Sequence, residues 1–501
     1  MISILDTTLR DGEQTSGVSF VQQEKLSLTR LLLEDLKVDR IEVASALVSE
    51  GEFEIVRSIA QWGSDSGHLP QIEVLGFVDG KRSADWVNRA GIKVMNLLCK
   101  GSQRHCALQL GKNTEEHIAD IRQTVLYAHS LGLRVNVYLE DWSNGIQNSP
   151  DYVYALIDEL RLLPVERYML PDTLGILTPP LTSRYCRQML ERYPDLQFDF
   201  HAHNDYDLAV ANVFAAVEAG IHCIHTTVNG LGERAGNAPL SSVVAVLNDH
   251  LHMKTNIEEK QILRISKIVE TYSGIRIPSN QPVIGESVFT QVAGVHADGD
   301  LKSKLYYNDL LPERFGRTRE YALGKTSGKA NIRKNLQAMG IQLDDKTMKK
   351  VTERIIELGD KKQMVTPEDL PYIVSDILKT EHLEEKFILR NYSLSISKDL
   401  RPIANLSAEV DGQIYNESST GDGQYDAFVK ALWKICDRLH RPHPVLADYA
   451  VTIPPGGRTD AFVQTVITWN MDGRIFKTHG LDGDQTEAAI KATVKMLNTI
   501  Y

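Results

Sequence analysis

The sequence predicts an α/β protein: a (β/α)8 TIM barrel, a helical linker region and a C-terminal regulatory domain made of a duplicated βββα unit. Two observations predict it. Through about residue 230, short apolar runs alternate with stretches of helical periodicity, and eight parallel βα units over such a length favour a closed barrel. From residue 387 onward, one pattern of strand-like runs followed by a helix occurs twice.

The predicted barrel strands are eight apolar runs. Leu28, Leu31, Leu32 and Leu36 recur at helical spacing after the first run, which predicts a helix with one apolar face. An open doubly wound sheet is the alternative, but it usually has a glycine-rich turn after its first strand, whereas polar residues 6–11 follow here. The eight runs are Ile2–Leu5, Ile41–Ala44, Ile72–Phe77, Val94–Leu98, Val135–Leu139, Tyr168–Leu170, Phe198–Phe200 and Cys223–Val228.

Length and repetition predict the domain division. A chain of 501 residues exceeds the size of one hydrophobic core, which rarely grows past ~300 residues. We expect a catalytic barrel with the start of a connector over residues 1–315, helical linker subdomains over 316–384 and the regulatory domain over 385–501. The pattern AxxKA occurs at 427–431 and again at 488–492, one in each predicted helix of the duplication.

Composition excludes several classes of protein. The net charge of −11 argues against nucleic acid or an anionic membrane as a partner. No apolar stretch approaches the ~18 residues of a membrane span, and the first residues do not resemble a signal peptide. Five cysteines, an odd number without paired spacing, do not form a disulfide framework. We therefore expect a cytoplasmic protein with reduced thiols.

A metal site is predicted at the carboxyl ends of the strands. Residues i and i+2 of an extended chain point the same way, so His201 and His203 can aim at one point. Asp11 follows the first strand and Asn237 the eighth, and these strand ends converge in a barrel. Two imidazoles, a carboxylate and an amide oxygen suit a divalent cation such as Mn, Mg or Zn. The alternative is a pair of surface or capping histidines.

Other side chains at this mouth suit substrate binding. Beside a metal, Arg10 can polarise a carbonyl group; the alternative is a plain salt bridge. The side chains of Leu75, Leu98 and Tyr138 would form a small apolar niche, unless they are ordinary barrel core. Thr173 follows the sixth strand and can donate its hydroxyl to a substrate carboxylate; Asp-Thr is equally typical of a helix N-cap.

Several motifs resemble those of a known family. Residues 9–14 (LRDGEQ), 201–205 (HAHND) and 230–237 (GLGERAGN) resemble motifs of the DRE-TIM metallolyase superfamily. Residues 294–299 (GVHADG) and the duplicated C-terminal domain resemble its 2-isopropylmalate synthase and homocitrate synthase family. Within that family, residues 137–145 (VYLEDWSNG) resemble the (R)-citramalate synthase branch. The resemblance covers essentially the whole chain.

The resemblance implies an activity. Members of this branch condense acetyl-CoA with pyruvate in a Claisen-type reaction that gives (R)-citramalate and CoA, the first step of the pyruvate pathway to isoleucine. A 2-isopropylmalate synthase, which uses 2-oxoisovalerate for leucine synthesis, is the alternative. A lyase related to hydroxymethylglutaryl-CoA lyase is disfavoured by the duplicated domain. A non-enzymatic amino-acid sensor is disfavoured by the intact Arg10, Asp11, His201 and His203.

The resemblance also implies functional residues beyond the metal site. Glu140 would be the catalytic base or its activator, and His296 and Tyr306 would be catalytic residues supplied to the neighbouring subunit of a homodimer. Acetyl-CoA would contact Glu140, Asp298, Lys304, Leu305 and Tyr306.

Feedback by isoleucine is implied in the same way. The effector would bind between paired βββα units at the dimer axis. The residues expected to contact it are Tyr425, Asp426, Leu446, Tyr449 and Gln485. The alternative is that these side chains only pack the domain, which would then serve dimerisation.

Overall fold

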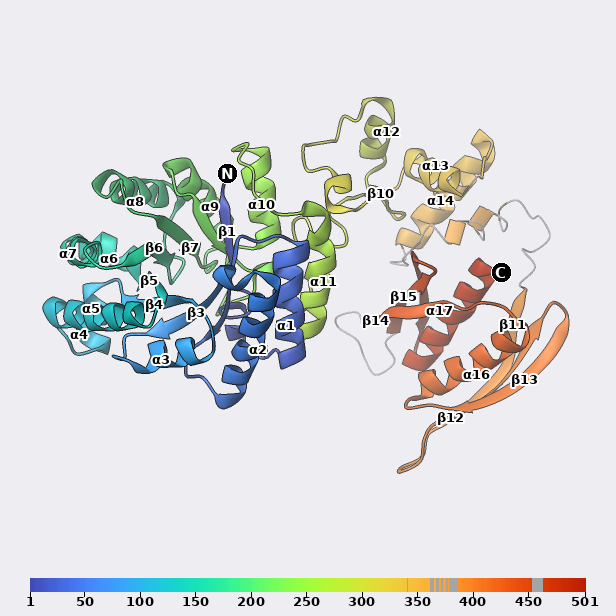
Figure 1. Ribbon diagram of the computed structural model, residues 1–501. Coiled ribbons are helices and arrows are strands. Elements are labelled where there is room, and N and C mark those ends of the chain that lie inside the picture. The colour runs from blue at the N-terminus through green and yellow to red at the C-terminus, as the bar shows by residue number, and fades with distance from the viewer. Residues whose placement is uncertain are drawn as a thin grey trace. The chain divides into compact units, whose positions relative to one another are not determined.

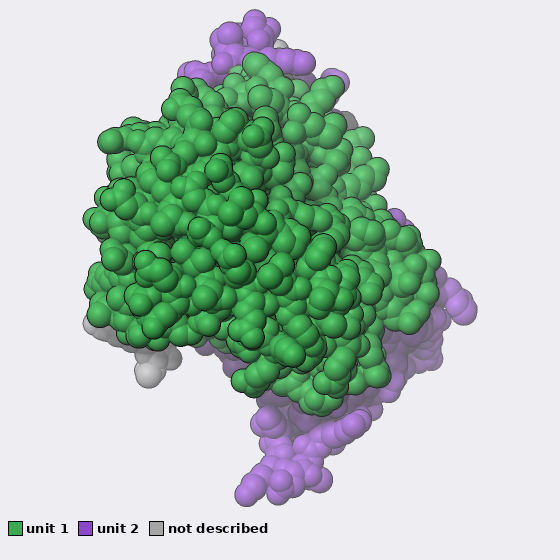
Figure 2. All heavy atoms as spheres, turned by 60° about the vertical axis from the view of Figure 1, so that its left-hand side comes forward, with its two compact units in different colours: residues 1–289, 307–319 green, residues 290–306, 320–501 purple. Residues whose placement is uncertain are grey.

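The computed structural model describes the chain except residues 340, 361–364, 366–368, 371–372, 375–376, 378–385 and 453–462. It divides into two compact units, coloured separately in Figure 2. The first comprises Met1–Phe289 with Tyr307–Arg319, and the second Thr290–Tyr306 with Glu320–Tyr501. The expected boundary between residues 384 and 385 lies outside the described residues, and the three-part division stays a prediction.

The first unit contains the predicted closed barrel. All neighbouring strand pairs are parallel, and β1 closes the barrel by pairing with β8. The barrel strands are buried on both faces, as expected for a parallel sheet that is covered by helices. All eight predicted strands are confirmed, with ends that shift by up to three residues. The strands are β1 (Ser3–Asp6), β2 (Arg40–Ser45), β3 (Ile72–Phe77), β4 (Val94–Lys100), β5 (Arg134–Glu140), β6 (Val165–Asp172), β7 (Phe198–Ala202) and β8 (Cys223–Thr226).

Helices surround the barrel (Figure 1). The predicted apolar face after β1 is confirmed, since Leu28, Leu32 and Leu36 are fully buried. Local signals set helix starts: the Ser49 hydroxyl accepts a hydrogen bond from the Glu52 N–H at 3.0 Å and caps α2. The helices are α1 (Gln22–Arg30), α2 (Glu50–Ser66), α3 (Arg82–Arg89), α4 (Gln103–Gln109), α5 (Thr114–Ser130), α6 (Trp142–Asn148), α7 (Pro150–Leu160), α8 (Pro179–Arg192), α9 (Ala209–Ala219), α10 (Leu240–Asp249) and α11 (Ile262–Ser273).

The first part of the second unit is mainly helical. It contains α12 (Gly294–Ser303), α13 (Lys329–Ala338) and α14 (Asp345–Asp360), with the short parallel strands β9 (Thr290–Gln291) and β10 (Glu320–Tyr321). The backbone at Gly294 approaches Gly328 so closely that a Cβ at Gly294 would lie 2.5 Å from the Gly328 Cα. Glycine is therefore required at this crossing.

The C-terminal part of the second unit is the predicted duplication. Two three-stranded antiparallel sheets, ordered β11-β12-β13 and β14-β15-β16, are each followed by a helix. In the second half, the sequence predicts strands over Tyr449–Ile453, with Leu446 before the strand, and over Ala461–Trp469; Ile453 and Ala461 lie outside the described residues. The elements are β11 (Phe387–Ser395), β12 (Ile403–Val410), β13 (Gln413–Thr420), α16 (Gln424–Arg438), β14 (Val445–Thr452), β15 (Val463–Met471), β16 (Arg474–Asp482) and α17 (Gln485–Ile500).

The two halves of the duplication share one apolar core. Phe428 and Leu432 of α16 are fully buried with Trp469 of β15 and Met496 of α17. In the part of the chain that the structure describes, no helix is long and apolar enough to cross a membrane.

Candidate active site

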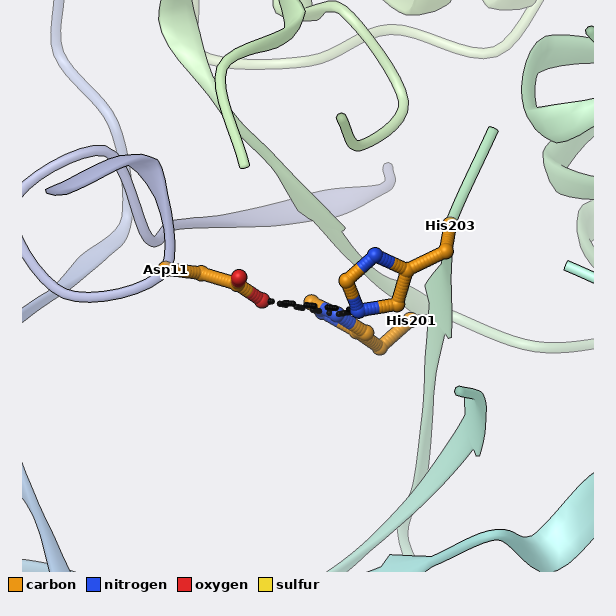
Figure 3. A group of neighbouring side chains, drawn as sticks. All are labelled: Asp11, His201 and His203. Carbon is orange, nitrogen blue, oxygen red and sulfur yellow. Dashed lines mark hydrogen bonds and ion pairs between the residues drawn. The ribbon is translucent and has the colours of Figure 1, made fainter. Parts of the chain in front are cut away.

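Three side chains, one from the turn after the first barrel strand and two from the seventh strand and its end, converge on one point. Asp11 lies in the turn after β1, His201 lies in β7 and His203 directly follows β7 (Figure 3). The Asp11 Oδ2 lies 3.1 Å from the His201 Nε2 and 3.8 Å from the His203 Nε2. The two Nε2 atoms are 3.3 Å apart, and all three side chains are buried. The structure thus brings together three of the four predicted metal ligands around a common centre.

The fourth predicted ligand, Asn237, lies beside His203. The two residues form an isolated antiparallel bridge. The Asn237 Nδ2 donates to the Leu231 carbonyl at 3.0 Å, which leaves the amide oxygen as the group available to a ligand. A Cβ at Gly232 would lie 2.2 Å from that Nδ2, so the glycine-rich loop makes room for the asparagine.

The chemistry of this donor set fits a divalent cation. Four buried atoms have no hydrogen-bond partner among the described residues: Asp11 Oδ1, Asn237 Oδ1 and the Nδ1 atoms of His201 and His203. Leaving such atoms unpaired in the interior is costly. Two imidazole nitrogens that face each other and a carboxylate are a typical nitrogen and oxygen ligand set for a metal.

Electrostatics keep these ligands in the forms that bind a cation. Burial raises the pKa of the Asp11 carboxyl, but Arg10 and His201 outweigh this effect and hold the pKa well below its usual range. Burial and the neighbouring His201 lower the pKa of His203 to about 4. Asp11 is therefore ionised and His203 neutral near pH 7.

Arg10 lies at the same centre and is held by three contacts. Its Nη1 lies 3.2 Å from the Asp11 Oδ2, and its Nε donates to the Glu42 Oε2 at 2.5 Å. Its Nη2 donates to the Tyr138 hydroxyl at 3.3 Å. Burial by itself would lower the pKa of Arg10, but Glu42 and Asp11 raise it above its usual value. Arg10 thus forms a salt bridge and also lies beside the metal ligands.

The three residues of the predicted apolar niche belong to one hydrophobic cluster inside the barrel, and their role in substrate binding stays a prediction. Leu75 and Tyr138 are buried in it, and the half-buried Leu98 packs against them. Leu98 and Tyr138 are directly paired between β4 and β5. Sequence analysis missed another member, Met169, which pairs with Tyr138 on β6. The strand register, which the sequence alone does not give, is the signal that identifies it.

Glu140 and Thr173 occupy neighbouring strand ends. Glu140 ends β5 and forms an ion pair with Lys100, the last residue of β4, which sequence analysis missed. The Thr173 hydroxyl oxygen accepts a hydrogen bond from the Asp141 N–H at 2.9 Å, so its own hydrogen remains to be donated. The N-cap alternative for Thr173 does not hold, because Thr178 is the N-cap of α8.

Apart from Glu140, the residues expected to act on acetyl-CoA belong to the second unit. The rings of His296 and Tyr306 contact each other, with centroids 4.1 Å apart. Asp298 accepts a hydrogen bond from Lys302 at 2.6 Å on the exposed side of α12. Lys304 follows α12 in a left-handed conformation, and the Leu305 side chain is 69% exposed. Their roles stay predictions.

Two of the expected effector residues form a contact in the regulatory domain. The rings of Tyr425 and Tyr449 lie 5.4 Å apart, and the Tyr425 hydroxyl is 2.7 Å from the Thr493 hydroxyl of α17. Leu446 was expected to precede the strand, but β14 already begins at Val445. The Leu446 side chain is 41% exposed.

Asp426 and Gln485 lie at the starts of the two helices of the duplication. Asp426, in the first turn of α16, accepts hydrogen bonds from the Asp422 N–H at 2.8 Å and from Lys430 at 2.7 Å. Gln485 is the first residue of α17. The internal repeat therefore places the two residues at equivalent helix ends.

Three family models match successive segments of the chain and together leave only residues 270–282 unmatched. Residues 1–269 match the HMGL-like family. Residues 283–363 match the homocitrate synthase post-HMGL domain-like family, and residues 364–501 match the LeuA allosteric (dimerisation) domain.

Two similar relatives come from Methanocaldococcus jannaschii. One, named (R)-citramalate synthase CimA, is 31% identical over 100% of this chain and 99% of the relative. The other, named 2-isopropylmalate synthase, is 32% identical over 100% of this chain and 94% of the relative.

Proposed function

Because the chain belongs to the HMGL-like family of citramalate and 2-isopropylmalate synthases, we propose that it condenses acetyl-CoA with pyruvate to give (R)-citramalate and CoA. The chain is therefore an enzyme, an acyltransferase that converts the acyl group into an alkyl group on transfer. The observation that carries the choice of pyruvate is the filled apolar niche of Leu75, Leu98 and Tyr138.

The niche favours the smallest 2-oxo acid for a steric reason. Leu75 and Tyr138 are 4% and 2% exposed, and their strands are fixed by the barrel. A methyl group fits beside such side chains, whereas an isopropyl group would overpack the niche. Overpacking of this kind costs ~1–3 kcal/mol.

The metal centre would be held by Asp11, His201 and His203, whose Oδ2 and Nε2 atoms face one another, and by Asn237, which lies beside His203. A divalent cation such as Mn, Mg or Zn supplies Lewis-acid polarisation of a substrate carbonyl there.

Arg10 and Thr173 would orient the 2-oxo acid. The Arg10 guanidinium, fixed beside Asp11, holds the ketone oxygen and stabilises the alkoxide that develops on it. The Thr173 hydroxyl, whose hydrogen is not used by Asp141, donates to the substrate carboxylate. Together they align the ketone carbon for attack, which is where positioning contributes most.

Glu140 is the proposed base or its activator. It takes a proton from the methyl group of acetyl-CoA, and the resulting enolate attacks the ketone carbon of pyruvate to form the new carbon–carbon bond. Water then cleaves the thioester, so that citramalate and CoA are released. The ion pair with Lys100 holds the Glu140 carboxylate in place at the end of β5.

A homodimer would complete the site. The second unit carries a segment that matches the LeuA dimerisation domain, and we propose that it presents His296 and Tyr306 to the neighbouring subunit. Asp298, Lys304 and Leu305 would contact acetyl-CoA with them. The paired rings of His296 and Tyr306 support a joint role.

Isoleucine is the proposed feedback effector. The contact of Tyr425 with Tyr449 supplies an aromatic wall, and Leu446 extends it toward the side chain of the amino acid. Asp426 and Gln485, at equivalent helix starts, would bind its ammonium and carboxylate groups. Coupling to the barrel requires two states that differ in effector affinity.

The alternative function is that of a 2-isopropylmalate synthase, because a relative of that name matches the whole chain. A 2-oxo-acid panel separates the two. Release of thiol from acetyl-CoA is measured with pyruvate, 2-oxobutanoate and 2-oxoisovalerate at equal concentrations in the presence of Mn²⁺. Preference for pyruvate supports the proposal, whereas preference for 2-oxoisovalerate assigns the enzyme to leucine synthesis.

A further inference from the structure

Arg10 is the end of a chain of buried hydrogen bonds that crosses the barrel interior. Its Nη2 donates to the Tyr138 hydroxyl at 3.3 Å. That hydroxyl lies 2.9 Å from the His225 Nδ1, and the His225 Nε2 lies 3.3 Å from the Asp199 Oδ2. Each of these side chains except Arg10 comes from a barrel strand, so the chain links β5, β8 and β7.

The direction of every hydrogen bond follows from the charge of Asp199. Its carboxylate accepts hydrogen bonds from the guanidinium groups of Arg40 and Arg167. A carboxylate that faces two such cations only accepts hydrogen bonds. The Nε2 of His225 lies against the same carboxylate and is therefore the donor of that hydrogen bond.

The remaining steps then have one solution. With its proton on Nε2, His225 is an acceptor at Nδ1, and the Tyr138 hydroxyl must donate to it. The oxygen of that hydroxyl is left with lone pairs, and one of them receives the Arg10 Nη2–H. If the Tyr138 hydroxyl pointed its hydrogen toward Arg10 instead, two donors, the Tyr138 O–H and the Arg10 N–H, would face each other.

At the Asp199 end, this chain of hydrogen bonds is held by the positive charge of Arg40. The Arg40 Nη2 donates to Asp199 and also to the Cys223 sulfur at 2.8 Å. Asp199, Cys223 and His225 lie close enough together to hold a metal ion, but the Arg40 guanidinium already occupies two of these three acceptors. A permanent cation of the protein thus stabilises Asp199 in place.

We propose that His225 is a positioning residue, which orients the Tyr138 hydroxyl and through it fixes the Arg10 guanidinium beside Asp11. Glu42 holds the Nε side of the same guanidinium at 2.5 Å, so Arg10 is clamped from two directions. Loss of one side allows the guanidinium to turn away from the ketone oxygen. This inference rests on the proposed role of Arg10 in the condensation.

A double-mutant cycle tests whether His225 acts on Arg10 through Tyr138. The variants are His225→Phe, Tyr138→Phe and the double variant; each substitution keeps an aromatic ring and removes the hydrogen bond. We expect His225→Phe to lower kcat with pyruvate by about 10- to 100-fold, since small misplacement of a catalytic group has effects of this size, with a smaller change in KM. In the Tyr138→Phe background, the same substitution should change kcat less than about threefold.

Losses that multiply in the double variant would overturn the proposal, as would a His225→Phe variant with wild-type kcat. His222→Phe is the matched control, because it makes the same substitution at an exposed histidine that directly precedes β8 and is not part of this chain of hydrogen bonds. It should retain kcat within about threefold, as expected for a residue outside the chain of hydrogen bonds.

A second measurement does not depend on turnover. Crystal structures of the wild type and of His225→Phe are compared at the Arg10 side chain. We expect the Arg10 Nη2 to leave the Tyr138 hydroxyl in the variant while Nε stays on Glu42. An unchanged Arg10 would overturn the inference. If the wild type condenses none of the 2-oxo acids, the proposed function fails, and this structural comparison still decides the role of His225.

Discussion

The Oδ2 of Asp11 lies 3.1 Å from the Nε2 of His201, although Asp11 follows the first strand of the barrel and His201 lies in the seventh. Closure of the barrel brings these distant segments together at its carboxyl end. His203 and Asn237 meet beside them. The local spacing of the two histidines supplies one part of the candidate site, and the strand order of the barrel brings Asp11 to it.

Loss of one metal ligand is expected to remove both metal and activity. His203→Ala deletes a neutral nitrogen donor from the cluster, so we expect the purified variant to retain less than about a tenth of the metal content and to lose most turnover. The barrel should stay folded by circular dichroism, because no core hydrocarbon is removed. His222→Ala, an exposed histidine, is the control. Near-normal turnover of His203→Ala after chelation and metal repletion contradicts the assignment.

Enlarging the niche is expected to change substrate preference. Leu98→Ala and Tyr138→Leu each remove volume next to the proposed methyl position, so the kcat/KM ratio of 2-oxobutanoate to pyruvate should rise by about 10-fold, the usual effect of one methylene. Leu126→Ala, an exposed residue of α5, should leave the ratio unchanged. An unaltered ratio in both niche variants would mean that these side chains are only barrel core.

Stability is expected to depend on pH through a buried carboxyl. Asp6 is fully buried at the end of β1 and accepts two hydrogen bonds from Thr8. Burial raises its pKa from 3.8 to about 7. The folded state therefore holds this proton more tightly than the unfolded state, and its contribution is present below pH 4 and is lost as the pH rises to 7.

Replacement of the Asp6 carboxyl tests the sign of this pH dependence of stability. Between pH 5 and pH 8, we expect the wild type to lose about 1–3 kcal/mol more free energy of unfolding than Asp6→Asn. Urea unfolding at the two pH values measures the difference, with the exposed Asp195→Asn as control. Equal pH dependence in wild type and Asp6→Asn would show that Asp6 ionises normally.

The regulatory prediction concerns the aromatic wall. Tyr449→Ala removes the ring that contacts Tyr425, and we expect the isoleucine concentration for half-inhibition of the full chain to rise by at least about tenfold. Tyr415→Ala in β13 serves as the matched aromatic control. Selective inhibition of the wild type by leucine would point to the leucine pathway, and no response to either would leave dimerisation as the role of this domain.

Much of the fold follows from the sequence because the buried strands of a parallel barrel are continuous apolar runs. The eight barrel strands are confirmed on that basis, and the duplicated βββα unit is confirmed from its repeated pattern of strand-like runs followed by a helix. The start of β14 at Val445 was missed, since exposed residues such as Leu446 and Ala447 lack the apolar pattern of a buried strand.

The candidate site could be predicted from the sequence only where a short motif contains the site residues. The spacing of His201 and His203 indicated convergence, and the structure shows it. Lys100 and Met169 were missed, because an ion pair between neighbouring strand ends and membership of the niche depend on register. The same is true of His225, whose hydrogen bonds join β8 to β7 and β5.

The most direct measurement of the central claim is thiol release from acetyl-CoA by the wild-type chain, with pyruvate and with 2-oxoisovalerate, before and after removal of divalent metal. The account predicts metal-dependent release with pyruvate and a kcat/KM for pyruvate at least about tenfold higher than for 2-oxoisovalerate. A higher kcat/KM for 2-oxoisovalerate, or full activity after metal removal, would contradict it.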